Sequence, residues 1–129
     1  MPTIWGPHTA RLERQGGLGS HAALAEAQRL DREWAADPIR VAVHRYEGLR
    51  DSHQRWVRQA AEITRWLDQQ DDVDPDRRVT FEWEDGCISH CCLRHLIENR
   101  AMALRNAAAC DDELVKAAAE LARVTRVAA

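Results

Sequence analysis

The chain has 129 residues, with 18 basic and 21 acidic side chains and a formal net charge of −3 at pH 7. This length is enough for one hydrophobic core, and the acidic excess argues against a protein that binds nucleic acid on its own, which would be basic. Charged residues interrupt every alanine-rich run, so no window resembles a signal peptide or a membrane span. We therefore expect one domain in the cytoplasm, with its four cysteines kept as reduced thiols.

The first 19 residues are rich in glycine and proline, a composition that disfavours regular structure. We therefore predict a mobile N-terminal arm over 1–19, in which Ala10 to Gln15 could form a turn of helix. A helical bundle domain is predicted over 20–129. Trp5 in this arm has two interpretations: it packs onto the surface of the domain, or it anchors a partner. Ser20 is a good N-cap residue, and apolar side chains then recur at helical spacing as far as Ala36, which predicts a helix over 20–36.

The segment 38–70 shows the longest helical pattern in the chain. Asp37 supplies an N-cap oxygen, and Pro38 suits the first helical position. Apolar residues recur at alternating steps of four and three along one face, and His53 is the one interruption. We predict a long central helix around which the other helices pack. Its apolar row comprises Ala42, Tyr46, Leu49, Trp56, Ala60, Ile63 and Leu67.

An acidic linker follows at 71–76, and then a short β element. Val79, Phe81 and Trp83 alternate with polar residues, which predicts a half-buried strand over 79–84. The pair Asp85 and Gly86 favours a tight turn after it.

Two more helices, over about 90–109 and 112–127, complete the chain. The first is predicted to be a core helix with an apolar stripe, and Asp111 or Asp112 could cap the second. The stripe comprises Leu93, Leu96, Ile97, Leu104, Ala107 and Ala108. The sequence therefore predicts an all-α fold, a single-domain bundle of about four helices. One helix is long and central, and a short strand or hairpin precedes the third.

Cysteines and histidines gather in the segment 87–95. Cys91 and His95 are four residues apart, so a helix would place them on one face, and Cys87 could join them from the preceding turn. Thiolate and imidazole are ligands that zinc prefers, with Cys110 or water as the fourth; small buried thiols are the alternative interpretation. Cys91 and His95 would also suit a nucleophile and its base, but no third residue orients them, so we predict no catalytic residues.

Two polar residues fall within apolar rows: His53 in the central helix and Arg100 in the helix expected over 90–109. They either form an internal polar pocket, or His53 is hydrogen-bonded in the core while Arg100 extends its guanidinium to solvent. Buried groups of this kind need a partner, and the carboxylates of Asp31 and Glu98 are candidates.

Arg40, Arg55, Arg58 and Arg65 lie along the polar face of the central helix, interleaved with acidic residues. This row is either a solvated face or a surface for a partner. A nucleic acid within a larger complex would be one such partner, contacted through its phosphate backbone without base specificity.

Two classes of function follow. The first is a non-catalytic adaptor or accessory subunit that acts by protein–protein association or self-association. The size, helical plan and arginine row resemble the small all-helical subunit of CRISPR effector complexes, in architecture and without a shared motif; the resemblance implies a subunit that lines nucleic acid without doing chemistry. A phage-borne protein that docks on a host target is another variant of this class. The second class is a zinc-binding helical bundle that uses Cys87, Cys91, His95 and Cys110.

Overall fold

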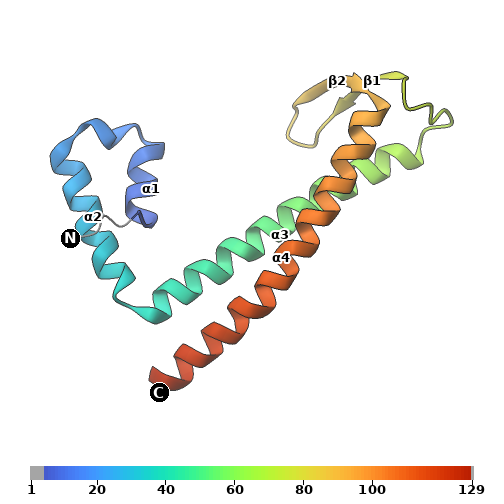
Figure 1. The fold of residues 1–129 in the computed structure, drawn as a ribbon. Helices are drawn as coiled ribbons and strands as arrows, with labels where there is room; N and C mark the ends of the chain where they lie inside the picture. The colour runs from blue at the N-terminus through green and yellow to red at the C-terminus, as the bar shows by residue number, and fades with distance from the viewer. Residues whose placement is uncertain (1–4, 129) are drawn as a thin grey trace. The chain divides into compact units, whose positions relative to one another are not determined.

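The computed structural model describes residues 5–128, which form four α-helices, a short 3-10 helix and a two-stranded hairpin (Figure 1). The chain divides into two compact units, one formed by the residues up to Tyr46 with those from Ala117, the other by Glu47–Lys116. None of the helices within 5–128 is long and apolar enough to cross a lipid bilayer. The elements are α1 (Pro7–Arg14), η1 (Gly17–Gly19), α2 (His21–Ala35), α3 (Pro38–Asp68), β1 (Arg78–Glu82), β2 (Ile88–Cys92) and α4 (Leu93–Ala128).

In the first unit, α2 and α3 begin where their capping residues predict. The Ser20 hydroxyl accepts a hydrogen bond from the Ala23 N–H (3.3 Å) at the start of α2. An Asp37 carboxylate oxygen accepts one from the Ile39 N–H (3.0 Å) at the start of α3. These bonds satisfy N–H groups that have no partner inside the helix. Both helix starts are therefore confirmed, as is the long helix that follows Asp37.

The segment expected to be a mobile arm with no more than a turn of helix carries α1. Gly6 is its N-cap residue, Pro7 is its first residue, and the side chain of Thr9 in its first turn is completely buried. The expected lack of a longer helix is wrong for Pro7–Arg14, because Asp31 of α2 supplies the capping carboxylate that the local sequence lacks. Residues 1–4 lie outside the described part of the chain.

The second unit contains the hairpin, whose strands pair antiparallel in a single register. Gly86 takes its turn with a φ of 90°, where a larger side chain would be strained. The Trp83 N–H donates a hydrogen bond to the Cys87 carbonyl oxygen (2.8 Å) across this turn. The predicted strand over 79–84 is confirmed as β1, with bounds that differ by up to two residues. The second strand extends to Cys92, where we expected helix.

One helix, α4, replaces the two expected over 90–109 and 112–127. Because α1 adds a helix at the start of the chain, the hairpin precedes the fourth and last helix and not the third. The helix passes through Cys110, Asp111 and Asp112 without a break. Both aspartates are exposed, so their carboxylates stay hydrated. Alanine-rich turns lie on both sides, and neither glycine nor proline interrupts them. Residues that would suit a helix start therefore do not force the preceding helix to end.

The core of the second unit combines residues of α3, the hairpin and the start of α4. Phe81 is 2% exposed, and its ring meets those of Trp66 and Trp83 edge-on, with centroids 5.8 and 4.6 Å apart. Edge-to-face contact is a favoured geometry for aromatic pairs. This packing fixes the hairpin against the end of α3. The other buried residues of the cluster are Ile63, Val79, Leu93 and Leu96.

Candidate functional site

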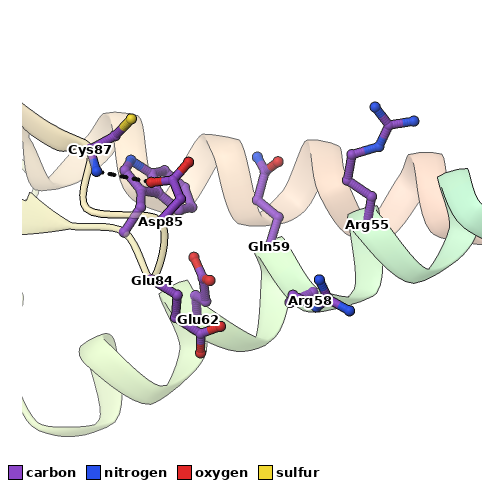
Figure 2. Close-up of a pocket in the computed structure, with 8 residues that line it drawn as sticks. Arg55, Arg58, Gln59, Glu62, Glu84, Asp85 and Cys87 are labelled. Carbon is purple, nitrogen blue, oxygen red and sulfur yellow. Dashed lines mark hydrogen bonds between the residues drawn. The ribbon is translucent and has the colours of Figure 1, made fainter.

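A groove of about 590 Å³ lies between α3 and the turn of the hairpin (Figure 2). One wall is a stretch of α3, and the other is the connection from β1 to β2. Figure 2 shows the carboxyl groups of Glu62 and Glu84 next to each other, and Arg55 extending away from the hairpin. The lining residues are Arg55, Arg58, Gln59, Glu62, Trp83, Glu84, Asp85 and Cys87.

The groove carries charges of both signs. Arg55 and Arg58 contribute positive charge from α3. Burial raises the pKa of Glu62, and the neighbouring carboxylate of Glu84 raises it further, because two adjacent anions repel each other. Arg65 lies 2.6 Å from the Glu84 carboxylate, measured from Nη2 to Oε1, and so compensates part of this charge. Such a groove suits polar contacts with a folded protein and would repel a polyanion at its acidic end.

The four predicted partner-binding arginines lie in different surroundings. Arg40 belongs to the first unit, where its Nε is 3.4 Å from the Asp37 carboxylate. Arg65 is paired with a hairpin glutamate. Arg55 and Arg58 line the groove. Since carboxylates neutralise two of the four, the row attracts phosphate less than its sequence suggests.

The predicted zinc ligands do not share a helix. Cys91 lies in β2 and His95 in the first turn of α4, so the four-residue helical spacing on which the prediction rested is wrong. Burial raises the pKa of the Cys91 thiol, and a hydrogen bond with the Asp85 carboxylate raises that of Cys87. Cys110 lies 17 residues beyond the start of α4, roughly 25 Å along its axis. Within 5–128, no three His, Cys, Asp or Glu side chains gather in a metal-binding arrangement.

His53 and Arg100, the residues expected to form an internal polar pocket, are both half-buried. Among the described residues, neither makes a hydrogen bond or an ion pair. Asp31, one of the carboxylates considered as their partner, is fully occupied at the start of α1. The polar pocket therefore stays a prediction.

Trp5 is 56% exposed and lines a cleft of about 560 Å³ in the first unit. The cleft also contains Trp34, whose ring meets that of His44 edge-on with centroids 5.3 Å apart. Trp5 thus keeps more than half of its surface accessible, which leaves the anchoring interpretation open. The remaining lining residues are Gly6, Pro7, Ala10, Arg11 and Arg14.

Asp31 is a buried site that the sequence reasoning missed. Its carboxylate accepts hydrogen bonds from the N–H groups of Gly6 (2.9 Å), His8 (2.9 Å) and Thr9 (3.0 Å), from the Thr9 hydroxyl (2.5 Å) and from His8 Nδ1 (2.9 Å). Burial raises the pKa of Asp31, but the bonds from Thr9, His8 and Gly6 outweigh it and hold the pKa at about 2. A signal was present, because Asp31 follows Ala27 by one turn on the buried side of α2.

A second missed feature is an apolar row on the outside of α4. Leu104 is 53% exposed and Val115 is 68% exposed. At about 100° per residue, these two positions, 11 residues apart, differ by only about 20° around the helix. We call the exposed set the outer row; its members are Ile97, Ala101, Leu104, Ala108, Asp111 and Val115, spaced alternately by four and three residues.

The outer row is distinct from the buried side of the same helix. Leu96, Ala103 and Ala107 are at most 6% exposed, and they lie roughly 100° around the helix from the outer row. The single apolar stripe predicted over 90–109 is therefore two rows. The expectation that Ile97 and Leu104 belong to the core is wrong.

Comparison of the chain with protein-family models, with curated proteins and with solved structures found no match. A function can therefore be inferred only from the chemistry of these surfaces.

Proposed function

We propose that the protein is a non-catalytic helical adaptor or accessory subunit that acts by protein–protein association. The outer row of α4 carries this proposal. Its apolar side chains are exposed on one continuous helix at the spacing with which helices bind one another. Burying such side chains stabilises a complex by about 25 cal/mol for each Å² removed from water.

A protein partner fits the charge distribution better than a nucleic acid. The arginines of α3 are accompanied by carboxylates, both in the groove and in the pairs of Arg40 with Asp37 and Arg65 with Glu84. An outer row of aliphatic side chains offers nothing to a phosphate backbone. The resemblance to the CRISPR small subunit implies a place in a nucleoprotein complex, and a host target is the other variant. In either case, binding would depend on protein contacts.

Light scattering on the purified full chain, after size-exclusion chromatography, tests the proposal. Leu104→Glu should abolish association, because it places a charge in the centre of the outer row. Ile88→Glu is the matched control, since Ile88 is 57% exposed but lies on β2. Circular dichroism should show equal helix content in all three proteins.

The wild-type chain could be monomeric because the outer row serves another partner. The exposed row would then limit the solubility of the chain. Leu104→Glu should then raise solubility more than Ile88→Glu does. A single chain whose solubility responds equally to both substitutions contradicts the proposal.

A further inference from the structure

We infer that the partner seated on the outer row is a second copy of this chain, bound antiparallel along α4. This inference rests on the proposed association function and specifies its partner. The two-fold axis would pass between Ala109 and Cys110, midway between Leu104 and Val115. An isologous contact of this kind is the commonest in protein assemblies.

The spacing of large and small residues fits this register. With the axis between 109 and 110, Leu104 of each copy lies opposite Val115 of the other, so the two branched aliphatic side chains that the outer row has between 104 and 115 pack against each other. Ala108 of each copy lies opposite Asp111 of the other. The alanine leaves room for the aspartate, so the one charged residue of the outer row is accommodated near the centre.

Charges beside the outer row complement each other in the same register. Arg105 and Asp112 are exposed and follow the row positions 104 and 111 by one residue, on the same flank of α4. Neither has a hydrogen-bond or ion-pair partner in the described part of the chain. The antiparallel arrangement places Arg105 of each copy beside Asp112 of the other, and so forms two equivalent ion pairs across the interface.

A parallel pairing in register lacks this complementarity. It would bring Asp111 against Asp111 near the centre of the contact. Each flank would then face the opposite flank of the partner, so Arg105 of one copy would not reach Asp112 of the other. Like charges at facing positions of paired helices are destabilising and select against that orientation. The antiparallel dimer is therefore the arrangement that the sequence of the row and its flank both favour.

Charge reversal distinguishes this dimer from other modes of association. Arg105→Asp places two pairs of acids across the interface, and Asp112→Arg places two pairs of bases there. Each variant alone should dimerise roughly tenfold more weakly than the wild type in sedimentation equilibrium. An equimolar mixture of the two should recover wild-type affinity, because every pair then becomes opposite in charge. Asp71→Arg, an exposed linker position, is the control for the charge change and should have no effect.

Native mass spectrometry of the mixture identifies the species formed. A predominance of the mixed dimer supports the inference. If the wild type dimerises but the mixture dimerises as weakly as each variant alone, the antiparallel register is wrong. In that case, loss of the dimer in Leu104→Glu would still support association through the outer row. A wild-type chain that stays single overturns this inference, and the solubility comparison of Leu104→Glu with Ile88→Glu then decides the proposed function separately.

Discussion

Replacing Asp31 by asparagine should release the start of α1 from α2. The carboxylate is completely buried and is the shared acceptor for the first free N–H groups of α1. Asparagine has the same shape, but it keeps only one acceptor oxygen and turns an NH₂ group toward groups that are themselves donors. At least one buried N–H or hydroxyl donor of Gly6, His8 or Thr9 must then lose its partner.

The cost has two parts. Lowering the pKa of Asp31 from 3.8 to about 2 corresponds to roughly 2 kcal/mol of preferential binding of the ionised form, at about 1.4 kcal/mol for each tenfold change. An unsatisfied buried donor costs about 1–3 kcal/mol. Because the two parts overlap, we expect Asp31→Asn to destabilise the first unit by roughly 2–4 kcal/mol.

The same shift gives a pH dependence with a definite sign. The folded pKa of Asp31 lies below its value in the unfolded chain, so the ionised carboxylate stabilises the fold at every pH above the unfolded value of 3.8. This contribution is lost as pH falls from 3.8 through about 2, because protonation then occurs in the folded state as well. The asparagine variant should lack this part of the acid transition.

Amide hydrogen exchange, followed by NMR, measures the effect where it arises. The amides of His8 and Thr9 should exchange faster in Asp31→Asn, in proportion to the loss of local stability. Glu33→Gln is the control, because Glu33 is an exposed acid on α2 that pairs with Arg29. Equal protection of the two amides in Asp31→Asn and the wild type would refute the capping role.

Four further substitutions, one of them a control, test the packing. Gly6→Ala should loosen α1, since its Cβ would lie 2.6 Å from an Asp31 oxygen. Gly19→Ala is the control and should be tolerated, because there is open space around its Cβ. Thermal unfolding compares the two variants, and equal melting temperatures would contradict the close packing at Gly6. Gly48→Ala, inside α3 with nothing within 4 Å, should stabilise the helix by about 1 kcal/mol in urea unfolding, and a loss of stability would contradict this. Phe81→Ala should cost about 3–5 kcal/mol in urea unfolding and shift tryptophan emission to the red; unchanged emission would argue against its aromatic contacts.

Those parts of the fold that depend on neighbouring residues could be predicted from the sequence. Ser20 and Asp37 cap helices whose first N–H groups lie two or three residues away, so each start is encoded locally. The alternation around Phe81 and the glycine at 86 likewise predict a strand and its turn within a short stretch. Elements of this kind need no knowledge of what they pack against.

The features that were missed depend on residues far apart in the chain. Asp31 caps a helix whose first residues precede it by more than 20 positions, and no local pattern links the two. The zinc hypothesis failed in its geometry for a related reason. Pairing with β1 keeps Cys91 in an extended strand, and helix begins only at Leu93, so Cys91 and His95 are not one helical turn apart. The tertiary pairing overrides a local preference that the sequence alone could not rank.

The two rows of α4 show how far an apolar pattern can be interpreted. Periodicity shows that a helix is apolar over a wide arc, but not which part of the arc its own chain covers. In the second unit the buried part is the row of Leu96, Ala103 and Ala107, and the unit reaches that burial without Leu104 or Val115. Polar residues at those two positions would leave this core intact, so folding does not account for the aliphatic side chains found there. The proposed association would account for them, because it would supply the second neighbour that so wide an apolar arc requires.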